Sequence, residues 1–205
     1  MLLSELLNVA KYSELNTLAV KDDIPALVSF VNLGLIDLYG LFSLRTEEHI
    51  IELEDGVTIY DLPADFMFIT GAYEAPSIFS NDNSINLPIN EEGNARSVNT
   101  INFKQVQIPL SLTGDYVGII YVAKPELMTA DNLDVDLPIP DQLVQPLLNF
   151  IAFKGQGGVT VNGQTEGDIY YARYRRSCDD IKRQGISIAS DDLGMSNRLG
   201  YRGFP

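Results

Sequence analysis

Few residues in this 205-residue chain are of the types that perform chemistry. His49 has no second histidine with which to share a metal ion, and a Ser-His triad would depend on this residue alone. The one cysteine, Cys178, shares an apolar helical spacing with Tyr174 and Ile181, where a free cysteine is typically inert core. Neither residue indicates catalysis.

Other polar clusters lack the spacing that a known site requires. The acidic stretch 131–136 has neither the central glycine nor the closing glutamate of an EF-hand loop, so it favours a solvated loop over a calcium site. No Gly-Lys-Ser/Thr follows the glycine cluster 155–158, which is typical of an interhelical loop. Adjacent carboxylates such as Glu47 and Glu48 point apart. We therefore expect no catalytic residue, metal site or cofactor, and no enzyme.

Composition limits the class of protein further. With 45% hydrophobic residues, a chain of this length can bury one core, or one core and a small subdomain. We expect no apolar run to approach the roughly 20 residues of a membrane span, and so no membrane as a partner. The start of the chain lacks the features of a signal peptide, and we expect synthesis in the cytoplasm.

The hydrophobic pattern predicts an α+β fold: a helical frame at both ends with an inserted antiparallel β subdomain. Helical spacing of apolar residues, with proline and acids near the starts, predicts helices at about 2–10, 23–42, 141–154 and 165–184. Gly34 and Gly40 interrupt the second helix and are expected to permit close helix packing.

Between the helices, the pattern changes to that of strands over about 49–123. Strands are expected at 66–73, 85–89, 97–110 and 116–123, separated by turn-rich segments. The turn Glu54-Asp55-Gly56 predicts a β-hairpin between its flanking apolar residues, because Asp-Gly favours such turns. Residues 1–186 are thus expected to form a single domain.

Charge is distributed unevenly along the chain. Up to Ala172 there are 7 Lys and Arg against 24 Asp and Glu, whereas from Arg173 onward there are 7 against 4. The strong negative charge up to Ala172 argues against a protein that wraps a nucleic-acid backbone. The same charge would be suitable for the wall of a channel that repels passing DNA. Residues 187–205 are expected to form an extended tail, because they have too few apolar residues for a core of their own. Its candidate docking residues are Leu193, Arg198, Leu199, Tyr201, Arg202 and Phe204.

The order of these parts resembles the head-to-tail adaptor, or neck, proteins of tailed bacteriophages, the group of tail tubular A-type and connector proteins. The resemblance covers about residues 1–186. It is based on the N-terminal helical pair and on Thr58-Ile-Tyr-Asp-Leu-Pro-Ala-Asp-Phe66 before the β region. It continues with the strand from Tyr116 to Pro125, and with Leu137-Pro-Ile-Pro-Asp-Gln-Leu-Val144 opening a long helix. The glycine-rich segment 154–158 departs from the family pattern and predicts a longer interhelical loop.

The resemblance implies a virion structural protein that forms a ring, of 12 copies in such adaptors, between the portal and a downstream nozzle or tube protein. It implies that the C-terminal tail docks on the portal and that DNA passes through without specific binding. In such a ring, Glu91, Glu92, Asp131, Asp134 and Asp136 are candidate channel-lining acids.

Two other classes remain open. Tyrosines in the strand region, such as Tyr60 and Tyr116, are also typical of a β-rich tail or fibre-attachment module. A small hydrolase with paired carboxylates is the third possibility, and no motif in the sequence supports it.

Overall fold

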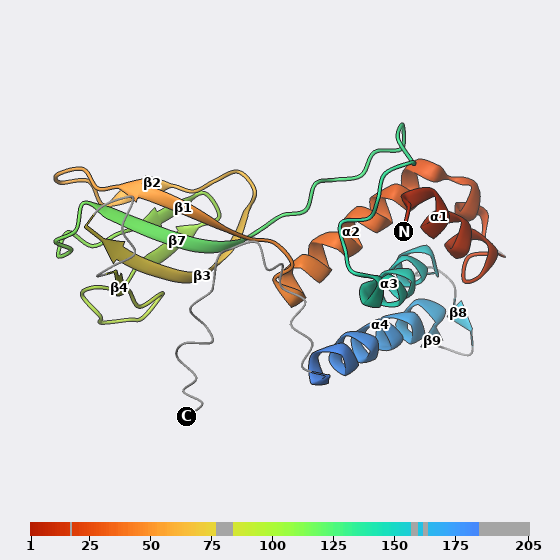
Figure 1. Cartoon of the computed structure of the whole chain (residues 1–205). Helices are drawn as coiled ribbons and strands as arrows, with labels where there is room; N and C mark the ends of the chain where they lie inside the picture. Colours follow the sequence, from red (N-terminus) through yellow and green to blue (C-terminus); the bar gives the residue numbers. More distant parts are fainter. Residues whose placement is uncertain (17, 77–83, 157–159, 162–163, 185–205) are drawn as a thin grey trace, which may run out of the picture. The chain divides into compact units, whose positions relative to one another are not determined.

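The structure is a computed structural model that describes the chain except residues 17, 77–83, 157–159, 162–163 and 185–205. Its contacts divide the described chain into two compact units. The helical unit joins Met1–Phe42 to the described residues from Pro125 onward, and the β unit is formed by Ser43–Lys124. Figure 1 shows helices at both ends of the chain and strands between them, which confirms the predicted α+β class.

The helical unit contains the four helices that the sequence predicts. They are α1 (Leu3–Tyr12), α2 (Ile24–Phe42), α3 (Val144–Gln156) and α4 (Glu166–Arg183). Two short 3-10 helices, Ala19–Asp22 and Asp141–Leu143, precede α2 and α3, and the latter explains why α3 begins after the predicted residue 141. The two-residue strands β8 (Thr160–Val161) and β9 (Gln164–Thr165) pair between α3 and α4.

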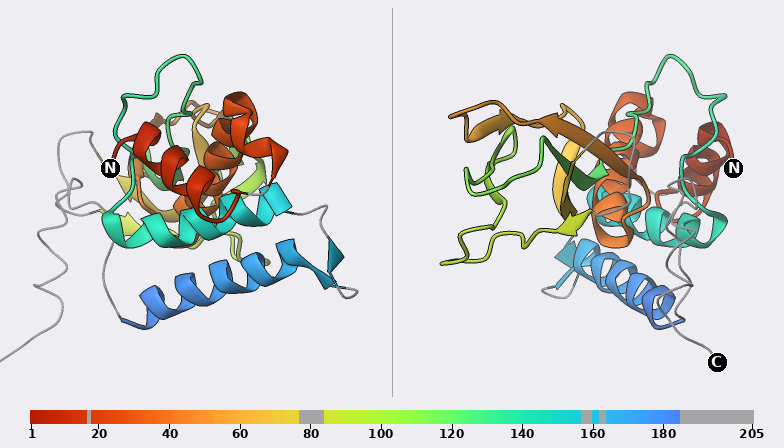
Figure 2. Two further views of the ribbon diagram at one scale, coloured as in Figure 1. Left: turned by 90° about the vertical axis from the view of Figure 1, so that its right-hand side faces the viewer. Right: turned by 60° about the vertical axis from the view of Figure 1, so that its left-hand side comes forward.

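Figures 1 and 2 show α3 and α4 side by side and antiparallel, with α2 also packed against α3. Gly34 makes the α2–α3 approach possible, because a Cβ at this position would lie 2.5 Å from Cδ1 of Leu147. The expected role of Gly34 in close packing is therefore confirmed. Fully buried side chains of the four helices fill this core: Leu3, Leu6, Leu27, Val31, Leu35, Leu38, Leu147, Ile151 and Tyr174.

Backbone hydrogen bonds fix the start of α1 to the segment before α3. The first N–H groups of a helix have no partner within the helix. Here Leu3 N donates to Val135 O at 2.9 Å and Ser4 N to Leu133 O at 3.0 Å, while Leu2 N donates to Glu5 Oε2. The segment that carries Asp131, Asp134 and Asp136 is thus held in place by its backbone, and the Asp136 carboxylate adds an ion pair with the N-terminal amino group at 3.6 Å.

The β unit is built from two antiparallel sheets. In the larger sheet, β1 (Thr46–Glu52), β7 (Tyr116–Ala123), β3 (Phe66–Ala75) and β4 (Ile85–Asn86) are neighbours in that order. In the smaller, the order is β2 (Ile59–Asp61), β6 (Gln105–Gln107) and β5 (Asn99–Asn102). Both contribute to one buried cluster, which consists of Ile51, Ala72, Leu87, Val98, Val106, Ile108, Val117 and Ile119.

The predicted hairpin at residues 54–56 is wrong. The turn itself forms, since Val57 N donates to Glu54 O at 3.1 Å and Gly56 has the positive φ of +74° that glycine tolerates. However, β1 pairs with β7 and β2 pairs with β6, so the strands on either side of the turn enter different sheets. The Asp-Gly signal is local, whereas pairing is decided by burial of each strand against distant partners.

Candidate functional site

The five candidate channel acids lie on the surfaces of both units. Glu91 and Glu92 are exposed in the turn after Ile89, in the β unit. Asp131, Asp134 and Asp136 are exposed on the segment before α3, in the helical unit. Each unit therefore presents exposed carboxylates of its own, and whether they face a channel stays a prediction.

The six candidate docking residues of the tail, from Leu193 to Phe204, lie outside the described residues. The structure therefore gives no geometry for them.

The residues first considered for chemistry have ordinary structural positions. Cys178 is 2% exposed on α4, as its helical spacing predicts, and burial raises the pKa of its thiol to about 11. His49 is half-buried in β1, opposite Ile119 of β7. Within the described ranges, no group of three or more His, Cys, Asp or Glu side chains is arranged to hold a metal ion.

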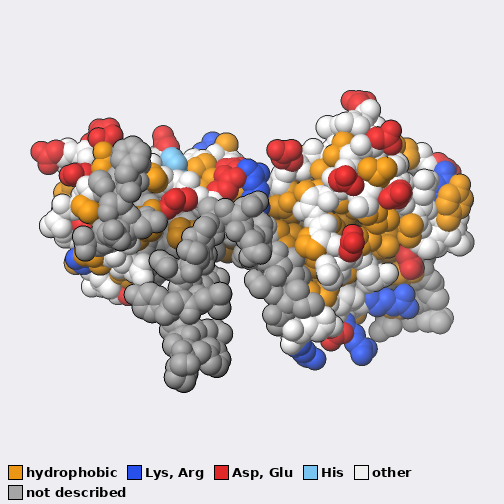
Figure 3. Space-filling view, in the orientation of Figure 1, with side chains coloured by type: hydrophobic (Ala, Val, Ile, Leu, Met, Phe, Trp, Pro, Cys, Tyr) orange, Lys and Arg blue, Asp and Glu red, His pale blue; other side chains and the backbone are white. Residues whose placement is uncertain are grey.

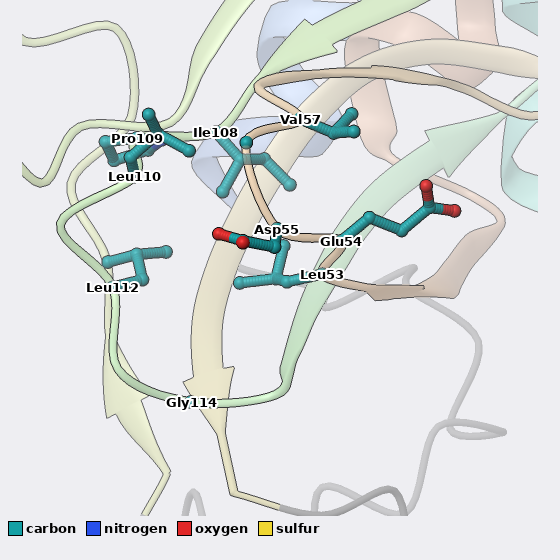
Figure 4. A pocket seen from close by; sticks show the side chains of 10 residues that line it. Leu53, Glu54, Asp55, Val57, Ile108, Pro109, Leu110, Leu112 and Gly114 are labelled. Atoms are coloured by element: carbon teal, nitrogen blue, oxygen red, sulfur yellow. The ribbon is translucent and has the colours of Figure 1, made fainter.

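A shallow groove lies at the turn of residues 53–57, and Figure 4 shows its lining. It has a volume of about 250 Å³ and is formed by this turn together with residues 108–114. Aliphatic side chains line it, with Leu110 66% exposed and Val57 37% exposed, together with the Glu54 and Asp55 carboxylates, and more of its lining surface is polar than apolar. Among the described residues that line it, none is a nucleophile or a histidine.

One cluster of ionisable side chains joins three strand ends of the β unit. The Tyr121 hydroxyl lies 3.1 Å from Oε2 of Glu47 and 3.2 Å from Oδ1 of Asp65. Arg45 forms ion pairs with both carboxylates. Burial, together with the two negative charges, raises the pKa of Tyr121, so the phenol stays protonated. The arrangement is a satisfied polar network that links distant segments.

Among the residues that the structure describes, Glu74 is the most buried carboxylate, with only 4% of its surface exposed. Its Oε1 accepts hydrogen bonds from Thr113 N at 2.6 Å and Gly114 N at 2.5 Å, while its Oε2 pairs with Arg96. Burial on its own would raise the pKa of Glu74, but these bonds and the Arg96 charge outweigh it and leave the pKa lowered. Glu74 thus fixes the loop before β7 and the turn containing Arg96 to strand β3.

Neither carboxylate cluster was identified from the sequence. Glu74 and Thr113 are 39 positions apart, and Glu47 and Tyr121 are 74 apart, so no motif spacing connects them. The sequence gives one sign that Glu74 is buried and paired: it is an acid among apolar and aromatic residues in a predicted strand.

Helix α2 corrects the expectation that no apolar run approaches the length of a membrane span. Ile24–Phe42 is a 19-residue helix with a mean hydropathy of 1.6, which is long and apolar enough to cross a bilayer by length and composition alone. Core helices of soluble proteins pass the same test. In this structure the face with Leu27, Val31 and Leu35 is buried in the helical unit.

The comparison with protein families agrees with the order of these elements. The model of the SU10 adaptor protein family matches residues 1–197. Since the match spans both units and nearly the whole chain, this protein belongs to the SU10 adaptor protein family. The search of curated proteins found no match.

Among solved structures, the chain is similar to one described as "Neck of empty GTA particle computed with C6 symmetry". The identity is 13%, and the alignment covers 85% of this chain and 88% of that chain. At a TM-score of 0.29, this similarity carries no argument about the fold or function of the chain.

Proposed function

We propose that this protein is a structural, non-enzymatic component of a phage virion neck, in which copies form a ring that joins the portal of the head to the tail. The match of residues 1–197 to the adaptor family carries the proposal. The fold is consistent with it, because two compact units with exposed surfaces of their own suit contacts with more than one partner. A ring of 12 copies is the stoichiometry that the resemblance implies.

Within this proposal, the C-terminal tail is the portal anchor. Arg198, Tyr201 and Arg202 are of the residue types that dominate interface hot spots, and Leu199 and Phe204 would supply the apolar contacts. Basic residues at this end follow an acidic body, so the tail and the body favour different partners.

The proposed second role of the neck is to conduct DNA without binding it. The candidate acids Glu91, Glu92, Asp131, Asp134 and Asp136 are all exposed in the structure. A wall of carboxylates repels the phosphate backbone, and so favours passage over adhesion.

The test is to mix this protein with the portal from the same genome and to measure the mass and negative-stain shape of the product. We expect a portal-plus-ring particle whose added mass corresponds to about 12 chains. A chain ending at Ile186 should fail to join it, and the triple variant Arg198→Ala, Tyr201→Ala, Arg202→Ala should bind more weakly. The triple variant Glu91→Gln, Glu92→Gln, Asp131→Asn serves as the matched control and should still form the particle.

Two outcomes would contradict parts of the proposal. If the full chain does not bind the portal, the adaptor function is wrong, and a chain that forms trimers by itself would instead favour the fibre-attachment module. If the chain ending at Ile186 binds as well as the full chain, the ring stands and the tail is not its anchor.

A further inference from the structure

The outward face of α2 carries a mainly apolar seam that the helical unit covers only in part, since Ser29 and Leu33 are exposed and the other seam residues are half-buried. Ala26, Ser29, Leu33, Ile36 and Gly40 follow one another at intervals of three and four residues, which places them on one stripe of the helix. This is the a/d spacing of a helix that packs along a second helix. The seam is opposite the stripe of Leu27, Val31 and Leu38 that forms the core.

Exposure and hydrogen bonding show that the seam is suited to burial. Leu33, at its centre, is 48% exposed, and the small residues at either end leave room for a second helix to approach. Ser29 is polar, but its Oγ donates to Pro25 O at 2.9 Å, so its donor is already satisfied within the helix.

A second exposed apolar side chain extends the seam on the segment beside it. Asn32 binds this segment through two bonds, donating from Nδ2 to Met128 O at 2.9 Å and accepting at Oδ1 from Met128 N at 2.8 Å. Leu127, next to Met128, is 60% exposed. Figure 3 shows the result as hydrophobic side chains gathered over α2 and this segment, with carboxylates among them.

The charges around the seam indicate what covers it. Helix α2 contains no Lys or Arg, and Asp37, Glu126 and Asp131 are exposed on α2 and the adjoining segment. Complementary chemistry occurs on α4 of the same unit. Its outward stripe repeats the spacing of three and four residues with Ile169, Ala172, Arg176, Asp179 and Arg183, so it carries two arginines and one acid.

The α4 stripe is available for contact. Ile169 is 47% exposed, and the side chain of Arg176 is 86% exposed, its nearest acid being Asp180 at 3.9 Å. Long arginine side chains cover apolar surface with their methylene stems while the guanidinium reaches a carboxylate. In Figure 3, Lys and Arg gather at the edge of the helical unit where α4 lies.

We propose that the α2 seam of one copy packs against the outward stripe of α4 of a second copy. The two stripes are different surfaces, so the contact is head-to-tail and repeats from copy to copy, as closure of a ring requires. This inference rests on the proposed function in that it names the contact between ring neighbours. It requires nothing of the portal or of the C-terminal tail.

Crosslinking of the full-length protein tests the contact directly. The variant with both Leu33→Cys and Ala172→Cys should give a ladder of covalent multimers with a short bis-maleimide, alone at high concentration or on the portal. Each variant with only one of the two added cysteines should remain monomeric on a denaturing gel, because the contact joins two different surfaces. The unmodified chain is the control, and its buried Cys178 should not crosslink.

Each outcome has a distinct meaning. Rings that form on the portal without a ladder would overturn the α2–α4 contact and leave the adaptor function intact. A ladder without portal binding would support the contact and contradict the adaptor function. Dimers from Leu33→Cys alone would overturn the inference in favour of an α2–α2 contact, and absence of both multimers and portal binding would overturn both proposals.

Sedimentation of two single variants gives an independent measure of self-association. Leu33→Glu should weaken self-association by about tenfold or more, because it places a charge at the centre of the seam. Val9→Glu is the matched control, since Val9 is 43% exposed on α1 and away from both stripes. Equal association of Leu33→Glu and the unmodified chain, with both folded by circular dichroism, would overturn the inference.

Discussion

The carboxylate of Glu74 gives the sharpest prediction about stability. Glu74→Gln keeps the shape of the side chain and removes its charge. Two backbone donors, Thr113 N and Gly114 N, lie 2.6 and 2.5 Å from Oε1 in a site where the residue is 4% exposed. If the amide oxygen of the glutamine takes their place, its NH2 group faces the Arg96 guanidinium, so a donor meets a donor.

The magnitude follows from these contacts. Hydrogen bonds to a charged group contribute roughly 1.5–3 kcal/mol each, against about 0.5–1.5 kcal/mol for neutral bonds. Replacing two charge-assisted bonds by neutral ones therefore costs about 2–3 kcal/mol. Arg96 adds little, because its side chain is 44% exposed and solvent screens the ion pair. We expect the β unit of Glu74→Gln to be less stable by about 2–3 kcal/mol at pH 7.

The effect should depend on pH in a defined direction. The pKa of Glu74 is lowered from its usual 4.5 in the folded state, so the carboxylate contributes stability above about pH 4.5. That contribution is lost as the pH falls through the folded-state pKa. The difference between the two proteins should therefore be constant near neutrality and shrink below pH 4.5.

Hydrogen exchange measured on the full chain is the appropriate assay, because it reports each unit separately. The amides of Thr113 and Gly114 should exchange faster in Glu74→Gln, while those of α3 remain unchanged. Glu52→Gln, an exposed carboxylate of β1, is the control and should leave exchange unaltered. Equal protection of the Gly114 amide in Glu74→Gln and in the unmodified chain at pH 7 would refute the reasoning.

Three further results are expected. Gly118→Ala should destabilise the β unit by about 1–3 kcal/mol in urea unfolding, because a Cβ would overlap the Tyr73 ring, and the loss should be smaller in a Tyr73→Ala background. Gly34→Val should lower the thermal midpoint, since its side chain would meet Leu147 of α3, and an unchanged midpoint would contradict the proposed close approach. At pH 8, Cys178 should react with a maleimide about 100-fold more slowly in the native chain than in urea, because burial raises the pKa of Cys178 from 9.0 to about 11.

Elements with a strong local pattern were predictable from the sequence. The strand from Tyr116 to Ala123 was predicted with its observed bounds, because its apolar and β-branched residues are buried on both faces. Helices were located to within a few residues by apolar spacing and by proline and acids near their starts. In such segments, the pattern of neighbouring apolar residues already indicates which side chains are buried.

Features that depend on distant partners were not predictable. The turn at residues 54–56 was correct, but the assignment of its two strands to one hairpin was wrong, because β1 finds its partner in β7. The burial of Glu74 depends on donors 39 and 40 positions away, and a glutamate in a strand gives no sign of them. Local propensity indicates the structure of a segment, whereas the pairing of strands and the hydrogen-bond partners of buried polar groups depend on the whole fold.

The composition of α2 connects the fold to the proposed assembly. A helix that is apolar on all sides is buried in a protein core or in a bilayer. A bilayer does not explain Asp37, which is charged, exposed and bound to the Tyr174 hydroxyl of α4. One side of α2 is accounted for by α3, and the other carries Leu33 at 48% exposure beside carboxylates. A second protein surface with exposed apolar and basic side chains would bury Leu33 and face these acids. The outward stripe of α4 of a second copy would supply them through Ile169, Arg176 and Arg183.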